Sequence, residues 1–400
     1  MYEVCARVFY RVMNSFVNEN TTLAVQSGSF YVYNTTMPEF IPGLQLSELY
    51  YQEAVKPILE AAFPQLVYSA SLIGPGSEVL GYDTPQSMDH NWGPKVLLFV
   101  KADDHERYQQ AIREVLSQQL PYEICGISTN FDPPDINGVQ SLEKIDAGPV
   151  NHLVSVHTIQ AYFEQALGVN PYQDIQSLAW LTIPEQKLLE VTAGKVFFDG
   201  LNELAQVRQK FSYYPHDIWL YLLASQWGRI AQEEAFMGRC GDVGDELGSQ
   251  LVAARMVREL MRLCFFMEKR YVPYTKWFGT AFSHLRSALD LAPLLREVLL
   301  AHNWKEREEY LSKAYERVAY LHNQLGITEP LATNVSHYYG RPYLVIYGER
   351  YVDAIMAQIQ DPAVKNIAHA IGSINQLVDS TDVLTNLSLT KKWQALFLEE

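Results

Sequence analysis

Residues 73–95 carry the combination of residue types in this chain best suited to hold a phosphorylated ligand. The stretch reads IGPGSEVLGYDTPQSMDHNWGPK and follows an apolar run. Gly76 has no Cβ to block a close approach, and Ser77 offers a hydroxyl and a backbone N–H. A helical turn starting at Ser77 would add further free N–H groups. We therefore expect Gly76 and Ser77 to bind a phosphate group.

Asp89 lies in the same segment, shortly before a second apolar run. Its carboxylate can face the same cleft as Ser77 and hold Mg²⁺ on the phosphates, because Mg²⁺ prefers hard oxygen ligands. We therefore expect Asp89 to be a metal ligand. Gly-Ser alone is weak evidence, whereas strand, Gly-Ser, loop, acid and strand together are moderately specific.

Three arginines in the second half of the chain form another candidate anion site. Arg255, Arg258 and Arg262 are three and four residues apart, hence on one face of a helix, and guanidinium groups suit phosphate oxygens. Residues 229–270 hold equal numbers of basic and acidic side chains in a chain of net charge −15. We expect the three arginines to bind phosphates or an acidic acceptor. The alternative is an ordinary ion-paired helix face.

Lys276 is a further candidate phosphate cation. It stands between Tyr274 and Trp277 in the sequence PYTKW. The alternative is a surface lysine whose aliphatic stem lies on its aromatic neighbours.

The apolar patterns around Gly76 and Asp89 predict an α/β domain with a small sheet. A helix over Leu44–Phe63 should kink or restart at Pro57. Asp103 or Asp104 should cap the helix that follows the second strand. The region 121–148 is rich in Pro, Gly and Asp, and we expect an irregular segment or a hairpin there. The three expected strands are Leu66–Ile73, Pro94–Val100 and Val150–Val156.

Beyond Asn170 the pattern is that of successive helices. We expect an appendage, or a misplaced translation start, over residues 1–36, an α/β domain over 37–170 and an all-α helical bundle over 171–400. The expected helices are Thr158–Leu167, Asp217–Met237, Ser249–Arg270, Trp277–Leu291, Leu294–His302, Lys305–Leu325 and Tyr351–Gln360.

Composition limits the class of protein. The chain has 400 residues, 48% of them hydrophobic and 19% charged, which is the composition of a globular protein of more than one domain. A net charge of −15 disfavours nucleic acid as a partner. The four cysteines are widely spaced, as expected for reduced thiols, and no apolar run reaches the roughly 18 residues of a membrane span. We therefore expect a cytoplasmic protein that has no membrane partner.

The stretch GSEVLGYDTPQSMDHNWGP resembles the motif of the polymerase-β-like nucleotidyltransferase superfamily, in which Gly-Ser is followed by two alternating acids. It is most similar to an uncharacterised bacterial family of that superfamily with the pattern S-x-D-H-D-W-G-P. The resemblance continues through WGRIAQEEAFMGRCGDVGDELGS, RYVPYTKWFGTAF and YYGRPYLVI. It implies a nucleotidyltransferase-like N-terminal domain and Mg²⁺-dependent chemistry.

Two departures from this motif concern the metal site. The family pattern has an acid where this chain has Asn91, and in a strand-like conformation Asn91 shares a face with Asp89, so the resemblance implies that these two residues are the metal ligands. The strand Val150–Val156 has no third acid. An amide supplies only a carbonyl dipole, so metal affinity should fall. By analogy with antibiotic nucleotidyltransferases, the resemblance also implies that Glu233 or Glu234 is the general base for an acceptor hydroxyl.

These observations lead to two functional hypotheses. The first is a nucleotidyltransferase that binds a nucleoside triphosphate and Mg²⁺ in a cleft between the domains and transfers a nucleotidyl group to a small-molecule acceptor. Asp89 would act with Glu233 or Glu234 in catalysis. The alternative is a catalytically silent nucleotide- or ligand-binding regulatory protein whose metal site is degenerate at Asn91.

Overall fold

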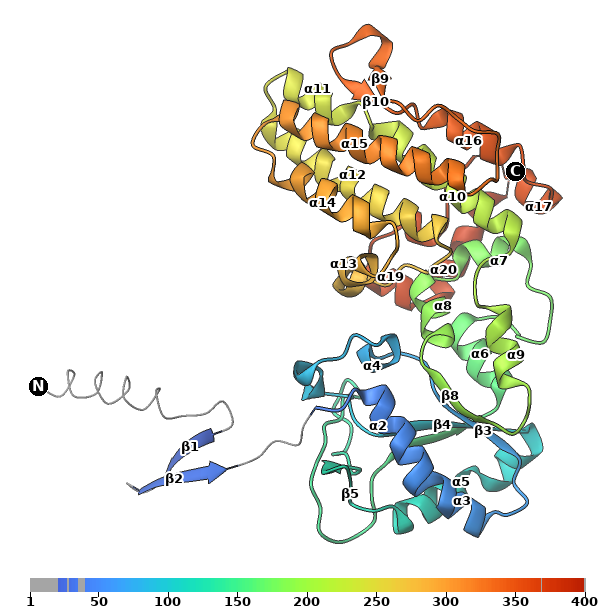
Figure 1. The fold of residues 1–400 in the computed structure, drawn as a ribbon. Coiled ribbons are helices and arrows are strands. Elements are labelled where there is room, and N and C mark those ends of the chain that lie inside the picture. Colours follow the sequence, from blue (N-terminus) through green and yellow to red (C-terminus); the bar gives the residue numbers. More distant parts are fainter. Residues whose placement is uncertain (1–20, 27–28, 35–39, 368, 399–400) are drawn as a thin grey trace, which may run out of the picture.

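A computed structural model describes residues 21–26, 29–34, 40–367 and 369–398. A mixed α/β part is followed by a helical part, as expected from the sequence (Figure 1). The central sheet has four strands in the order β7-β4-β3-β8, and only the β4–β7 pair is parallel. The strands are β3 (Tyr68–Leu72), β4 (Lys95–Val100), β7 (Leu153–His157) and β8 (Lys195–Asp199).

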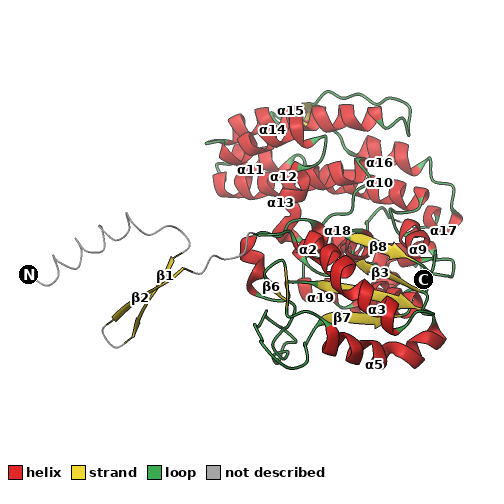
Figure 2. Ribbon diagram, turned by 60° about the horizontal axis from the view of Figure 1, so that its bottom comes forward, coloured by secondary structure: helices red, strands yellow, loops and turns green. Residues whose placement is uncertain are grey.

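Alternating side chains of β4 serve two different cores. Val96, Leu98 and Val100 pack under the helices of the N-terminal part, whereas Phe99 faces the core shared with the helical part. Both faces of the sheet are therefore covered, which explains the continuous apolar run in this strand. Figure 2 shows the sheet with α2 (Gly43–Tyr50), α3 (Lys56–Ala62) and α5 (Ala102–Gln119) around it.

The opening helix passes through Pro57 without a break. A π-helical turn, η1 (Tyr51–Val55), joins α2 to α3 just before the proline. Pro57 has no N–H to donate, so the carbonyl four residues earlier loses its regular partner and the wider turn absorbs the mismatch. Tyr50 and Tyr51 in this region are fully buried.

The expected cap of α5 is wrong. Lys101 occupies the N-cap position without a side-chain hydrogen bond, and Asp103 and Asp104 lie in the first turn. Their charges still favour the positive end of the helix. Ile112 and Leu116 are the residues that this helix buries.

Strand β8 was not expected from the sequence. Its residues KVFFD lie in the part that the sequence pattern assigns to helices, yet they pair with β3 at the edge of the sheet. Its apolar run is only three residues long, Val196 to Phe198, which is too short to indicate a strand, and all five side chains are exposed or only partly buried. Four helices flank it in the chain: α6 (Ile159–Leu167), α7 (Ser177–Thr182), α8 (Glu185–Thr192) and α9 (Leu204–Lys210).

The irregular region 121–148 contains a short hairpin, as expected. It pairs β5 (Glu123–Ile124) with β6 (Ile127–Ser128). Before it, the loop after β3 holds α4 (Ser77–Leu80) and the 3-10 turn η2 (Pro85–Asp89).

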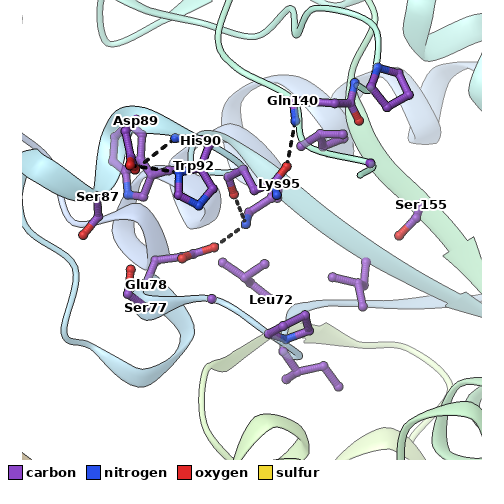
Figure 3. Close-up of a pocket in the computed structure, with 18 of the residues that line it drawn as sticks. Leu72, Ser77, Glu78, Ser87, Asp89, His90, Trp92, Lys95, Gln140 and Ser155 are labelled. Carbon is purple, nitrogen blue, oxygen red and sulfur yellow. Dashed lines mark hydrogen bonds and ion pairs between the residues drawn. The ribbon is translucent and has the colours of Figure 1, made fainter. Parts of the chain in front are cut away.

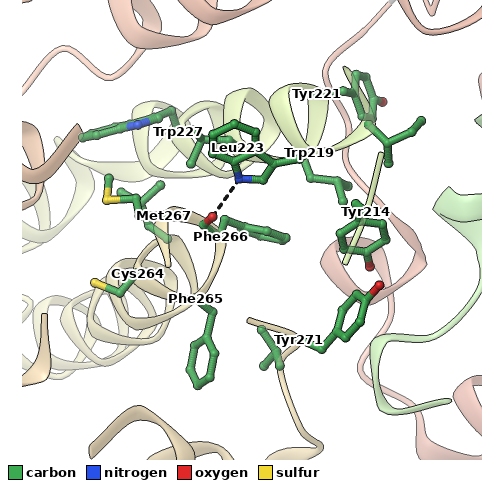
Figure 4. Close-up of a cluster of buried hydrophobic side chains, with 14 of the residues drawn as sticks. Tyr214, Trp219, Tyr221, Leu223, Trp227, Cys264, Phe265, Phe266, Met267 and Tyr271 are labelled. Carbon is green, nitrogen blue, oxygen red and sulfur yellow. Dashed lines mark hydrogen bonds between the residues drawn. The ribbon is translucent and has the colours of Figure 1, made fainter. Parts of the chain in front are cut away.

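The helical part is built on α10 and α12. Trp219 of α10 donates an indole N–H to the Phe266 carbonyl of α12 at 2.7 Å, within a large apolar core (Figure 4). Pro293 lies inside α14 and does not divide it, although the sequence suggested two helices there. The main helices are α10 (His216–Glu233), α11 (Phe236–Asp242), α12 (Glu246–Met267), α13 (Thr275–Ser283), α14 (Ala288–Leu300), α15 (Trp304–Gln324) and α16 (Glu349–Met356).

Smaller elements complete the described chain. Within the expected appendage 1–36, β1 (Thr21–Gln26) pairs with β2 (Ser29–Asn34), and the rest of that appendage lies outside the described residues. No helix in the described ranges is both long and apolar enough to cross a bilayer. The others are β9 (Ser336–His337), η3 (Tyr338–Gly340), β10 (Leu344–Val345), α17 (Pro362–Lys365), α18 (Ile374–Leu377), α19 (Thr381–Thr385), α20 (Leu387–Lys392) and η4 (Trp393–Phe397).

Candidate functional site

A cavity of about 1100 Å³ lies between the sheet and the helical part. Figure 3 shows the wall formed by the end of β3, the loop after it and β7. The helical part contributes the segment around α13, with Tyr274 and Trp277. The cavity thus has walls from both parts of the chain. Of the residues singled out in the sequence, it brings together Gly76, Ser77, Asp89, Asn91 and Lys276.

Gly76 adopts a conformation that strongly favours glycine. Its φ is +139°, and a Cβ there would lie 2.5 Å from Oε1 of Glu78. The carboxylate of Glu78 therefore folds back onto the Gly-Ser turn. The helix α4 that starts at Ser77 is a single turn of four residues, too short to contribute the N-terminal field expected from the sequence.

Lys95, which no sequence motif indicates, forms an ion pair with Glu78. The side chains are 15% and 3% exposed, respectively. The Lys95 ammonium also donates to the carbonyl of Asn91 at 2.8 Å. The sequence signal that could have indicated Lys95 is a lysine at the start of an otherwise apolar strand, since β4 reads KVLLFV.

Asp89 lies on the cavity wall with 63% of its side chain exposed. Its Oδ2 is 2.9 Å from Nδ1 of His90. Desolvation raises the pKa of Asp89, but hydrogen bonds from His90 and the local backbone outweigh it and hold the pKa below its usual value. The carboxylate is therefore ionised at neutral pH.

Asn91 does not share a strand face with Asp89, contrary to the expectation. Its φ of +50° places it in the left-handed region, which asparagine tolerates better than most residues. Its backbone N–H donates to the Gln140 carbonyl at 2.7 Å, and its Oδ1 accepts from the Gln140 N–H at 3.0 Å. The amide oxygen that could face a metal is already bound to the loop of Gln140.

The residues around the cavity do not fit the expected Mg²⁺ site. Among the described residues, no three His, Cys, Asp or Glu side chains converge as metal ligands would. Glu78 is paired with Lys95, and Asp83 accepts from the Gly43 N–H and the Trp92 indole. On β7 the cavity is lined by Ser155, whose hydroxyl is bound to His157. Asp89 is left without a second carboxylate partner for a metal.

The three arginines lie away from the cavity, and each has a carboxylate partner. Arg262 pairs with Glu185 inside the helical part. Arg258 pairs with Asp379 at 2.7 Å, and Arg255 with Glu233 at 3.0 Å. This is the ion-paired helix face that the sequence left open as the alternative.

Glu233 and Glu234 also lie away from the cavity. Glu233 is engaged by Arg255, as above. Glu234 is buried and accepts N–H groups of Ile346, Tyr347 and Gly348 at 2.8, 2.9 and 3.2 Å. Desolvation raises the pKa of Glu234 to about 7, against these hydrogen bonds. Glu234 therefore fixes the loop before α16 through these hydrogen bonds.

The ionisable side chains of the cavity give it a positive balance. The cations Lys95, Arg113 and Lys276 outnumber the carboxylates Glu78 and Asp89. Burial lowers the pKa of His152, so this histidine is neutral. Within the described ranges no carboxylate forms an ion pair with Arg113 or Lys276, while Lys276 lies 4.9 Å above the Trp277 ring. In a chain of net charge −15, this is a place where an anion would be stabilised.

Comparison with known proteins yields one family match. Residues 180–278 match the model of a family described as a domain of unknown function, DUF4037. No curated protein and no solved structure matches the chain significantly. The match agrees with the expected resemblance to an uncharacterised family. It runs from α7 through β8, α10 and α12 and ends in α13, in the cavity segment around Lys276.

Proposed function

We propose that the cavity binds a nucleoside triphosphate or a related phosphorylated nucleotide, and that the protein acts as a ligand-binding regulatory protein. The observation that carries this proposal is the positively charged cavity beside the Gly76–Ser77 turn, in an otherwise acidic chain. Its volume of about 1100 Å³ is sufficient for a nucleotide.

The phosphates would lie between the two parts of the chain. Ser77 offers a hydroxyl from the loop after β3, while Arg113 of α5 and Lys276 of α13 offer positive charge. Neither cation is committed to a carboxylate in the described structure, so neither has to give up a partner when an anion binds. Charge-assisted hydrogen bonds of this type are stronger than neutral ones.

The nucleobase would lie against the aromatic wall. Tyr274 and Trp277 both line the cavity, and Tyr82 packs against Trp277 with ring centroids 5.3 Å apart. The Tyr274 backbone N–H is anchored by Gln186 at 3.0 Å, which positions this wall. Stacking on such rings tolerates any of the bases.

Nucleotidyl transfer to a small-molecule acceptor is the second candidate. The exposed carboxylate of Asp89 at the cavity favours it. Regulatory binding accounts better for the remaining geometry, since Asn91 is bound to Gln140 and Glu78 to Lys95.

Thermal unfolding with ATP, GTP, CTP and UTP, each with and without Mg²⁺, tests the proposal. A ligand at about 100 times its Kd adds roughly 2.7 kcal/mol to the unfolding free energy. We expect a rise in Tm that does not require Mg²⁺ and that Lys276→Met removes. Lys305→Met is the matched control, because Lys305 also lies over a tryptophan, Trp304, at 3.6 Å, but outside the cavity.

Two outcomes would contradict the regulatory proposal. The absence of a shift with all four nucleotides would exclude nucleotide binding in this cavity. Mg²⁺-dependent release of pyrophosphate that Asp89→Ala abolishes would identify a transferase instead.

A further inference from the structure

We propose that Glu78 is an internal competitor of the ligand, which occupies Lys95 in the empty cavity and so lowers the affinity for phosphorylated ligands. This inference rests on the proposed function, because it concerns how the same cavity takes up its ligand.

Glu78 lies directly against the Gly76–Ser77 turn. Both its carboxylate oxygens and Cδ lie within 2.6 Å of the point that a Cβ of Gly76 would occupy. The carboxylate thus covers the turn at which a phosphate would otherwise approach the backbone (Figure 3). An anionic ligand at Gly76 meets this negative charge first.

Lys95 is held at the cavity wall by two partners. Its ammonium group binds the Glu78 carboxylate and the Asn91 carbonyl, and all three residues line the cavity. The bond to Asn91 does not depend on Glu78, so it can hold Lys95 at the cavity wall when Glu78 moves away. A phosphoryl oxygen could then take the place of the carboxylate on the ammonium.

Charge decides which ligands can make this exchange. A phosphoryl group of charge near −2 attracts Lys95 more strongly than a carboxylate of charge −1 does. A neutral ligand gains nothing from Lys95, and a monocarboxylate only replaces one equivalent bond with another. The cost of displacing Glu78 therefore falls on anionic ligands that bind Lys95, whereas a neutral ligand is unaffected.

Calorimetric titration with ATP and with adenosine tests the role of Glu78 in the full-length chain. In Glu78→Gln the competing charge is gone while the side-chain shape and one acceptor oxygen remain. We expect ATP to bind about tenfold more tightly, corresponding to about 1.4 kcal/mol, and adenosine to bind as it does to the wild type.

The control variant is Glu48→Gln. Glu48 is also paired with a lysine, Lys195, at 2.7 Å, and it does not line the cavity. Glu48→Gln changes the net charge of the chain by the same amount as Glu78→Gln does. Because Glu48 lies outside the cavity, this variant should leave the affinity for ATP unaltered. A gain in Glu48→Gln as large as that in Glu78→Gln would show a general charge effect and overturn the inference.

A double variant guards against misfolding of the single one. Glu78→Gln leaves Lys95 without a carboxylate, whereas Glu78→Gln with Lys95→Gln removes both charges. In the double variant we expect the preference for ATP over adenosine to fall below that of the wild type. An unchanged preference there, or unchanged ATP affinity in folded Glu78→Gln, would overturn the role of Glu78 while nucleotide binding stands. Failure of every variant and the wild type to bind ATP would overturn the proposed function and this inference together.

Discussion

Glu185 and Arg262 form a buried ion pair that joins the start of α8 to the middle of α12. Their side chains are 0% and 8% exposed. The second carboxylate oxygen of Glu185 accepts the Val272 N–H at 2.9 Å. One acid therefore fixes both the arginine of α12 and the chain that leaves this helix toward the cavity.

Arg262→Met should destabilise the protein strongly. Removing one partner of a buried pair typically costs about 3–5 kcal/mol, because the other charge remains buried without compensation. Urea denaturation measures the loss, and the double variant with Glu185→Gln should recover part of it. Reduced nucleotide affinity with unchanged stability would instead support the phosphate-binding role expected from the sequence.

Arg258→Ala should have a small effect. Arg258 and Asp379 are 40% and 74% exposed, and exposed pairs contribute up to about 1 kcal/mol. Thermal unfolding at low and high salt should show a minor decrease that salt reduces. A large loss of nucleotide binding in this variant would contradict its placement outside the cavity.

Asn91→Asp should not create a Mg²⁺ site. An aspartate tolerates the left-handed conformation and can keep the bond to the Gln140 N–H. Asp89 faces His90 instead, at 2.9 Å. Titration calorimetry with MgCl₂ should give the same weak or absent heat as the wild type, and tight binding that Asp89→Asn abolishes would contradict this.

Glu234 should make stability depend on pH. Its pKa rises from 4.5 to about 7 in the folded protein, so the folded state holds the proton more tightly than the unfolded state. The resulting contribution to the unfolding free energy is fully present below pH 4.5 and is lost as the pH rises to about 7. One pKa unit corresponds to about 1.4 kcal/mol, so the loss is about 3 kcal/mol.

Denaturation of the wild type and of Glu234→Gln from pH 4.5 to 8 isolates this contribution. The difference in unfolding free energy between the two proteins should change by that amount over this range, in favour of Glu234→Gln at high pH. A constant difference would show that Glu234 keeps an ordinary pKa.

Gly76→Ala should disturb the cavity more than the rest of the fold. The added Cβ would meet the Glu78 carboxylate, and a φ of +139° is strained for alanine by about 1–3 kcal/mol. We expect a lower Tm and a weaker response to ATP. Gly81→Ala is the matched control, since Gly81 also has a positive φ of +73° but open space around it. Equal effects on ATP binding would contradict a special role of Gly76.

The sequence by itself determined the order of the main elements. A continuous apolar run located β4, because a strand covered on both faces must be apolar throughout, and mixed runs located β3 and β7 to within a few residues. The proximity of Gly76 and Asp89 in one cavity also followed from their places beside neighbouring strands.

Only the tertiary structure decided which charges are free. The sequence placed Arg258 and Arg262 on one helical face, but their partners Asp379 and Glu185 are 121 and 77 residues away in the chain. The turn at Asn91 likewise depends on Gln140, 49 residues further on. Periodicity indicates which positions are buried within one element, whereas the pairing of charges depends on how distant elements pack. That packing pairs Lys95 with Glu78 and leaves Lys276 open to a ligand.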